Sequence, residues 1–395
     1  MVDEAAVRAA IAAVDADQVV AFARRLIAAP SENPGGTEHE AAAVAAEMLQ
    51  PLGASMRTVE SPDGRPNLLA TFGGTGPRLV WNGHLDVVPV GEPSGWPHPP
   101  FDGVVEGGVL HGRGAADMKG AVGAALGAVA AIRRAGVAHG GTLELHLVAD
   151  EEHLGTHGTR VLREHGLLDA DACIVGEPTR LDIALAERGG AWVALTAKGR
   201  GAHGSTPDLG VYAITSMARV LLRLHEVLPD DGSHPLVGRP SVNAALIAGG
   251  TAPNVVPDRC VVDVDRRTIP GEARDDVLAA FDRVIASVRD EHPETDVEVE
   301  LREWTEAAEI DPADPFVAIV RDAVTAERGR APEDTGLTGI SDARFYLNDA
   351  HVPTVILGPG DLRVAHTHDE RVEVDELVTA ARIYARIFLT FLRAA

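Results

Sequence analysis

Two residues of the segment 81–89, His84 and Asp86, are spaced as in a metal centre. A neutral imidazole is a good zinc ligand, and a carboxylate two residues further on can hold the other ring nitrogen. That second bond fixes the tautomer of the histidine and raises its basicity toward the metal. One such pair is weak evidence, because a single histidine is more often an ordinary buried side chain.

Four further segments carry ligands of the same kind. They are Gly112-Arg-Gly-Ala-Ala-Asp117-Met-Lys-Gly, Asp150-Glu151-Glu152, Gly176-Glu177-Pro178 and His366-Thr-His368-Asp-Glu370. Two zinc ions about 3.5–4 Å apart need a bridging carboxylate and terminal ligands on each side. Asp117 suits the bridge, because it is a short carboxylate in a glycine-flanked turn. The five segments together therefore predict a centre for two metal ions.

The adjacent acids Glu151 and Glu152 follow a predicted strand, and only one of them needs to bind metal. The other can serve as a general base. Zinc lowers the pKa of a bound water to about 7, and a carboxylate within hydrogen-bond reach can take its proton and deliver it to a leaving amine. This chemistry is amide hydrolysis without a covalent intermediate.

The amino-acid composition limits which classes of protein this chain can belong to. A chain of 395 residues exceeds one ordinary hydrophobic core, so we expect two domains. The 59 acidic residues outnumber the 35 basic residues, and without a basic tract we expect no nucleic-acid partner. The two cysteines are too few for a disulfide framework. No secretory leader and no apolar stretch of about 18 residues stand out, which favours a cytoplasmic enzyme with no membrane contact.

Hydrophobic patterning predicts the elements that carry these residues. Helices are expected at 17–28, 37–52, 120–135 and 158–165, and strands at 67–72, 78–82, 142–149 and 172–175. This alternation favours an α/β layer fold. The metal candidates of the first half follow predicted strands, and ligands of open α/β sheets gather at the carboxyl ends of strands.

The pattern changes over residues 187–301, which we predict to be an inserted domain. Strands are expected at 191–198, 241–248, 259–267 and 296–301, and helices at 211–227 and 274–289. The order βαββαβ is that of a ferredoxin-like unit. The rest, residues 1–186 and 302–395, is predicted to form a discontinuous catalytic domain. It resumes with a helix near 315–327, a strand at 353–357 and a helix at 374–392.

At these motifs the chain resembles the M20 metallopeptidase family, in the branch with acetylornithine deacetylase and succinyl-diaminopimelate desuccinylase. The resemblance implies a zinc-peptidase-like α/β catalytic domain and two divalent cations, most simply Zn²⁺, with Co²⁺ or Mn²⁺ as substitutes. It also implies a cis peptide bond after Asp117. The implied metal ligands are His84, Asp117 as bridge, Glu152, Glu177 and His366, with Glu151 as general base and Asp86 as the partner of His84. His366 is preferred to His368 because Glu370 follows the ligand by four residues in the family pattern.

The resemblance also assigns a lid and dimerisation role to the inserted domain, so a homodimer is expected. His203, in the segment 201–207, is implied to stabilise the oxyanion in the active site of a neighbouring subunit. Asn254 and Arg266 resemble contacts to a substrate carboxylate. Gly339 and Ser341 resemble a late loop that also faces the substrate.

Two departures bear on the substrate, which is expected to be a small N-acyl amino acid or peptide. Desuccinylases usually carry a basic pair before a glycine, where this chain has Glu187-Arg188-Gly189, and an aromatic residue at the position of Thr206. An uncharged acyl group such as acetyl is therefore preferred. Succinyl-diaminopimelate desuccinylase activity, an exo- or dipeptidase and a non-catalytic metal-binding or purely structural dimer remain alternatives.

Overall fold

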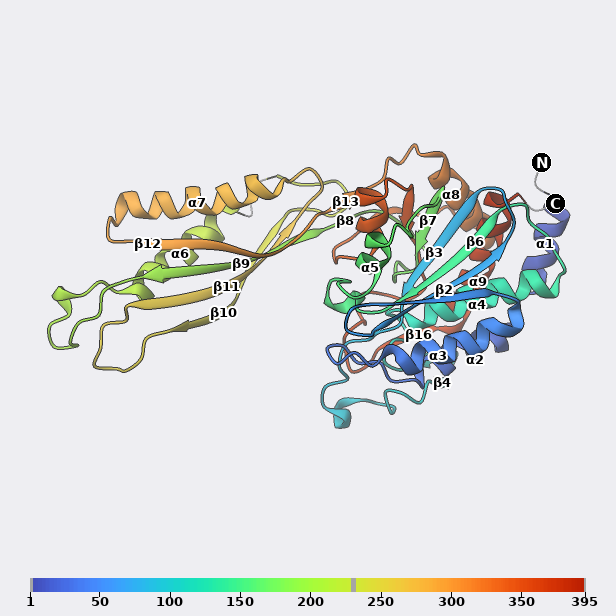
Figure 1. Ribbon diagram of the computed structural model, residues 1–395, viewed down its shortest axis with the longest axis horizontal. Coiled ribbons are helices and arrows are strands. Elements are labelled where there is room, and N and C mark those ends of the chain that lie inside the picture. Colours follow the sequence, from blue (N-terminus) through green and yellow to red (C-terminus); the bar gives the residue numbers. More distant parts are fainter. Residues whose placement is uncertain (1–2, 229–231, 394–395) are drawn as a thin grey trace. The chain divides into compact units, whose positions relative to one another are not determined.

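The computed structural model describes residues 3–228 and 232–393. The chain divides into two compact units, whose elements are shown in Figure 1. The first unit comprises the residues up to Leu185, the segment Ile310–Thr335 and the residues from Ser341 onward. The second unit comprises Ala186–Glu309 and Gly336–Ile340. The α/β fold class is confirmed, while the lid and dimerisation role of the second unit remains a prediction.

The first unit is built on a mixed sheet in the order β1-β2-β6-β3-β7-β15-β8. These strands are β1 (Ser55–Glu60), β2 (Pro66–Gly73), β6 (Thr142–Val148), β3 (Arg78–His84), β7 (Ala172–Val175), β15 (Thr354–Ile356) and β8 (Ile183–Glu187). β3 runs parallel to β6 and β7, and β15 runs parallel to β7. All four residues of β7 are buried, including Cys173, as expected of a strand covered on both faces.

Helices cover this sheet (Figure 1). They are α1 (Glu4–Ala12), α2 (Ala16–Ile27), α3 (Glu38–Leu49), α4 (Lys119–Arg134), α5 (Thr159–Glu164), α8 (Pro315–Arg328) and α9 (Val374–Phe391). The small residues of α4 allow α2 to approach closely, because a Cβ atom on Gly127 would lie 2.4 Å from Val19. The predicted helix over 37–52 ends at Leu49 as an α-helix and closes with a 3-10 turn over Gln50–Leu52.

A small sheet in the order β16-β5-β4 brings two distant loops together. Its strands are β4 (Val104–Glu106), β5 (Val109–His111) and β16 (Arg371–Glu373). Arg371 pairs with His111 in an antiparallel register. The loop after β5, which carries Asp117, therefore starts beside the end of the loop that carries His366.

The second unit has the predicted ferredoxin-like order of elements. These are β9 (Gly189–Lys198), α6 (Ala213–Val227), β10 (Ser241–Gly249), β11 (Arg259–Thr268), α7 (Arg274–Glu291) and β12 (Asp296–Thr305). The antiparallel sheet has the order β10-β11-β9-β12, and α6 and α7 cover one face around the buried side chains of Met217 and Phe281. β12 passes its predicted end at residue 301, because a register shift between Leu301 and Glu303 interrupts the alternation of side chains. Two short strands, β13 (Ala308–Glu309) and β14 (Asp334–Leu337), complete the chain path.

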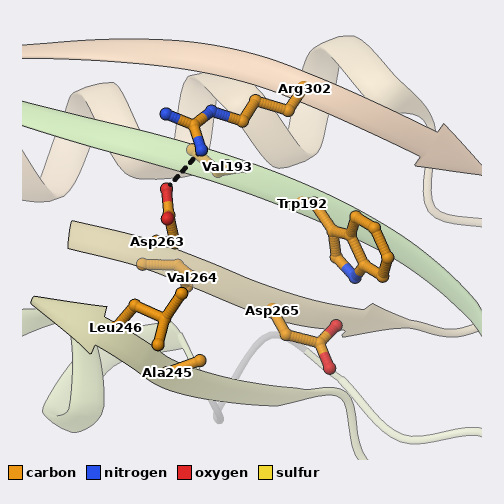
Figure 2. A pocket seen from close by; sticks show the side chains of 8 residues that line it. All are labelled: Trp192, Val193, Ala245, Leu246, Asp263, Val264, Asp265 and Arg302. Atoms are coloured by element: carbon orange, nitrogen blue, oxygen red, sulfur yellow. Dashed lines mark ion pairs between the residues drawn. The ribbon is translucent and has the colours of Figure 1, made fainter.

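A hollow of about 250 Å³ lies on the sheet of the second unit (Figure 2). It is lined by Trp192, Val193, Ala245, Leu246, Asp263, Val264, Asp265 and Arg302. An ion pair of 2.8 Å joins the carboxylate of Asp263 to the guanidinium of Arg302 across it. None of the helices in the described ranges combines the length and apolarity that crossing a bilayer requires.

Candidate metal centre

Two histidines of the first unit, His84 and His366, contact different oxygens of one carboxylate, that of Asp117. His84 Nε2 lies 3.0 Å from Asp117 Oδ1, and His366 Nε2 lies 3.3 Å from Asp117 Oδ2. A further acid approaches the same ring nitrogen of each histidine. Glu177 Oε1 is 3.7 Å from His84 Nε2, and Glu152 Oε2 is 3.0 Å from His366 Nε2. The five predicted ligands thus lie together, with Asp117 in the middle.

The fold explains why these residues meet. His84 ends β3, Glu151 and Glu152 follow β6, and Glu177 follows β7, so the carboxyl ends of three neighbouring parallel strands contribute to one site. Asp117 precedes α4, and the peptide bond between Asp117 and Met118 is cis, as the family resemblance implies.

The centre attracts positive charge. Burial, followed by the neighbouring carboxylates of Asp117 and Glu151, raises the pKa of Glu177 well above its ordinary value. Hydrogen bonds to Asp117 and Glu152 raise the pKa of His366 to about 10. Buried carboxylates at such spacing are costly unless a proton or a cation offsets their charge. The carboxylates therefore favour the presence of cations at this place.

The donor set fits divalent cations. His84, Asp117 and Glu152 form a group whose ligand atoms lie within 4.8 Å of one another, and His84, Glu151 and Glu177 form a second such group. In the ranges that the structure describes, the buried Oε1 atoms of Glu152 and Glu177 make no hydrogen bond. Imidazole nitrogens combined with carboxylate oxygens suit zinc and its first-row neighbours.

Glu151 lies beside the centre and is partly buried. Its Oε2 atom is 3.9 Å from His84 Nε2. Burial raises the pKa of Glu151 well above its ordinary value, and the carboxylates of Asp342 and Glu152 add to this effect. A carboxyl group whose pKa is moved toward neutrality is suited to accept a proton and then release it.

Asp86 orients His84 through its backbone oxygen as well as through its carboxylate, whereas the sequence predicted only the carboxylate contact. His84 Nδ1 lies 2.9 Å from the backbone oxygen of Asp86 and 3.5 Å from its Oδ1 atom. The carboxylate of Asp86 also accepts hydrogen bonds from the backbone N–H groups of Glu151 and Glu152, each at 3.1 Å. Asp86 therefore holds both the histidine and the turn that carries the two acids.

Glu370 and Arg113 hold the loop of Asp117. Glu370 Oε1 accepts hydrogen bonds from the backbone N–H groups of Gly114, Ala116 and Asp117 at 3.0–3.1 Å. Its Oε2 atom pairs with Arg113 at 2.5 Å, and both side chains are buried. Sequence reasoning missed Arg113, because periodicity does not identify the partner of a buried charge. The one available signal was its place in the turn before Asp117.

The remaining predicted residues are distributed over both units. Ser341 is buried in the first unit, and its hydroxyl accepts a hydrogen bond of 3.2 Å from the backbone N–H of Ala343. The other four, which are His203, Asn254, Arg266 and Gly339, belong to the second unit.

Within the second unit, the segments of His203 and Asn254 adjoin, because the backbone N–H of Gly204 donates to the oxygen of Asn254 at 2.8 Å. Arg266 is buried and pairs with Glu272 at 2.6 Å. The roles of these residues toward the substrate stay predictions.

An acid-rich centre for two divalent cations, with a carboxylate beside it at the carboxyl edge of an α/β sheet, defines a metal-dependent hydrolase of amide bonds. Residues 80–390 match the model of Peptidase family M20/M25/M40. The chain belongs to this family, as the sequence motifs predicted.

Curated relatives extend over nearly the whole chain. A succinyl-diaminopimelate desuccinylase from Methylobacterium sp. (strain 4-46) is 34% identical over 397 residues, covering 95% of this chain and 96% of the relative. Another from Maricaulis maris (strain MCS10) is 34% identical, covering 93% and 94%.

Solved structures share the fold at lower identity. A tripeptidase from Staphylococcus aureus has a TM-score of 0.79 at 22% identity, covering 96% of this chain and 99% of that one. Human carnosine dipeptidase 1 also has a TM-score of 0.79, at 18% identity, with 98% of each chain covered. These structures support the architecture of the catalytic and inserted parts.

Proposed function

We propose that the protein hydrolyses the amide bond of a small N-acyl amino acid. The observation that supports this most directly is the placement of Asp117 between His84 and His366, with Glu151 beside His84. Such an arrangement suits two cations that share one carboxylate. The family membership and the curated relatives agree with a deacylase of amino-acid derivatives.

His84, Asp117, Glu152, Glu177 and His366 would hold the two cations, and zinc is the favoured metal. When bound, the cations would activate a water molecule and polarise the scissile carbonyl. Glu151 would take a proton from that water on its carboxylate and deliver it to the leaving amine nitrogen. Asp86 would keep the proton of His84 on Nδ1, where the backbone oxygen of Asp86 accepts it, so that Nε2 is free to bind metal.

Residues of the second unit would act on the substrate. His203 would donate a hydrogen bond to the oxyanion that develops on the carbonyl. Asn254 would contact the carboxylate of the substrate, together with the loop of Gly339 and Ser341. Arg266 would join them by exchanging its ion pair with Glu272 for the substrate carboxylate.

The acyl group has two candidates. Acetyl is favoured by the chemistry around Arg188, whose guanidinium already donates to the backbone oxygens of Val237 and Arg239 at 2.7 and 2.8 Å. An arginine held in this way is less available to bind the free carboxylate of a succinyl group. Succinyl is favoured by the curated relatives, which carry the name of succinyl-diaminopimelate desuccinylase at 32–34% identity.

The protein would act as a homodimer formed through the second unit. β10 is an edge strand of its sheet, and Leu246 and Ile247 on it are 66% and 64% exposed. Leu222 on α6 is 68% exposed. An exposed apolar edge strand offers unpaired backbone groups and apolar side chains to another chain, and a second copy is the partner that we propose.

A hydrolysis screen after metal reconstitution tests the function. The substrates are matched N-acetyl, N-succinyl and N-formyl amino acids together with dipeptides. We expect release of a free amino group from the N-acetyl series and a weaker signal from the N-succinyl series. Reversal of that order would assign the succinyl group, and cleavage of dipeptides alone would assign a peptidase. A metal-loaded protein that cleaves no member of the panel would overturn the proposal.

A further inference from the structure

Behind the turn of Glu151 and Glu152 lies a buried ion chain that the proposed chemistry does not use. It consists of Glu38 at the start of α3, Arg65 just before β2 and Asp150 two residues after the end of β6. Their residue exposures are 0%, 8% and 2%. Arg65 Nη1 donates to Asp150 Oδ1 at 2.6 Å, and its other nitrogens donate to the carboxylate of Glu38. A single guanidinium thus joins two buried acids from distant segments.

Asp150 is the residue at which the chain turns into the site. Its φ of 64° lies in the left-handed region, which is unusual for a residue other than glycine. Its carboxylate accepts hydrogen bonds from Arg65, from Asn33 Nδ2 at 3.0 Å and from the backbone N–H of His157 at 2.9 Å. Such charge-assisted bonds can hold a backbone conformation that the local sequence does not favour.

Asn33 joins this chain to Asp86. Its Nδ2 atom donates to Asp86 Oδ2 at 2.8 Å as well as to Asp150 Oδ1. Asp86 in turn accepts the backbone N–H groups of Glu151 and Glu152. The turn is therefore held on one side by Asp150 and on the other by Asp86, and Asn33 links the two carboxylates.

Arg65 supplies the positive charge that offsets the buried carboxylates of Glu38 and Asp150. If Arg65 lost its charge, Glu38 and Asp150 would be left as buried carboxylates without a cationic partner. Removing one partner of a buried ion pair is strongly destabilising for this reason. The carboxylate of Asp150 would then lose its charged donor, and the turn next to it would be held less firmly, by Asn33, His157 and Asp86 alone.

We propose that Arg65 is a positioning residue for amide hydrolysis, which acts through Asp150 to hold Glu151 and Glu152 at the metal centre. This inference rests on the proposed function, because the effect on turnover is defined only for an active enzyme. Arg65 does not touch the substrate in this scheme. Its role is to fix the place of the general base and of one metal ligand.

The test compares Arg65→Met and Arg65→Lys with Arg328→Met. Arg328 is a matched control because its side chain is 12% exposed, against 10% for Arg65, and it pairs with Asp182 at 2.7 Å. For each metal-reconstituted protein, kcat and KM are measured per folded molecule, and metal affinity is measured by competition with a chelator. Outer-sphere partners of metal ligands typically contribute about 10–100-fold in affinity or activity.

We expect Arg65→Met to lower kcat and metal affinity by about 10–100-fold with KM little changed. Arg65→Lys should recover part of the loss, because it keeps the charge but not the two-pronged geometry of the guanidinium. Arg328→Met should lose stability while kcat and metal affinity stay at the wild-type level.

If Arg65→Met matches Arg328→Met in kcat and metal affinity, the inference is wrong. Should Arg65→Met fail to fold, Arg65→Lys carries the comparison, because it keeps a cation beside Glu38 and Asp150 but cannot bond to both carboxylates as the guanidinium does. Wild-type kcat and metal affinity in Arg65→Lys would then contradict the inference. Wild-type protein that hydrolyses nothing would refute the proposed function instead. In that case the chelator competition still decides whether Arg65 positions the metal ligands.

Discussion

The imidazole of His366 lies against the carboxylate of Asp117, with Nε2 3.3 Å from Oδ2. The two residues are far apart in the chain, and the pairing of Arg371 with His111 between β16 and β5 brings their loops together. His368, two residues further on, lies instead against the ring of Trp96, with the ring centroids 5.9 Å apart. The neighbouring histidines of this loop therefore have different surroundings.

We predict that His366→Ala weakens binding of one of the two cations, because it removes a terminal ligand while leaving the group around His84 intact. Turnover should fall by at least about 100-fold, because even the outer-sphere partners of metal ligands contribute about 10–100-fold. The metal content measured by atomic absorption after dialysis should drop from two ions toward one. His368→Ala is the matched control and should retain both ions. Equal metal loss in the two variants would contradict the assignment of His366.

Glu151→Gln should keep the metal content and remove turnover, because the amide preserves the shape of the side chain but cannot accept the proton. A loss of about 10²–10⁴-fold in kcat is expected for a general base. Glu152→Gln should differ by weakening metal binding, since its carboxylate lies 3.0 Å from His366 Nε2. Measured turnover and metal content of both variants separate the two roles. Substantial turnover by Glu151→Gln would mean that another group moves the proton.

Glu370→Gln should destabilise the protein, because it leaves the buried guanidinium of Arg113 without its carboxylate partner at 2.5 Å. Loss of one partner of a buried pair costs about 3–5 kcal/mol. Urea unfolding of the metal-free proteins measures the change in the free energy of unfolding. Glu47→Gln is the control, because its pair with Arg25 is exposed and such pairs contribute about 0–1 kcal/mol. Similar losses in both variants would contradict the role of the buried pair.

The decrease in the free energy of unfolding at acid pH should depend in part on Glu144. A hydrogen bond from His146 lowers the pKa of Glu144 below its ordinary value of 4.5. A carboxylate whose pKa is lower in the folded state stabilises the protein above the unfolded-state pKa, and this contribution is lost as the pH falls through the folded-state pKa. We therefore expect wild type to exceed Glu144→Gln in stability at neutral pH, with the difference shrinking below about pH 4.5. Urea unfolding at a series of pH values tests this, and a constant difference would contradict it.

Association should depend on the exposed apolar side chains of the second unit. Ile247→Lys and Leu222→Glu place charges where a second copy would cover side chains that are 64% and 68% exposed. We expect both variants to shift the protein from dimer to monomer in light scattering coupled to size-exclusion chromatography. Val105→Glu, at a site on β4 of the first unit that is 44% exposed, should leave the mass unchanged. A wild-type protein that is monomeric at all concentrations would contradict the proposed dimer.

Much of the architecture was predictable because it depends on local patterns. The alternation of strands and helices indicated the α/β class, and the order βαββαβ indicated the ferredoxin-like unit. The number of helices and the positions at which they begin were less predictable. The helix α1 was missed, although Asp3 accepts a hydrogen bond from the backbone N–H of Ala5 at 2.9 Å and so caps its start.

The sequence by itself determined the chemical types and the order of the metal-site residues, because acids and histidines after strands have few other common uses at such spacing. Only the tertiary structure decided which groups meet. The contact of His366 with Asp117 depends on strand pairing across the chain, and the support of Asp150 by Arg65 depends on three segments that fold onto one another. A buried charge needs a partner of opposite charge or a hydrogen-bonding group. Its sequence neighbours do not determine which partner it finds, because the packing of distant elements decides which side chains come within reach.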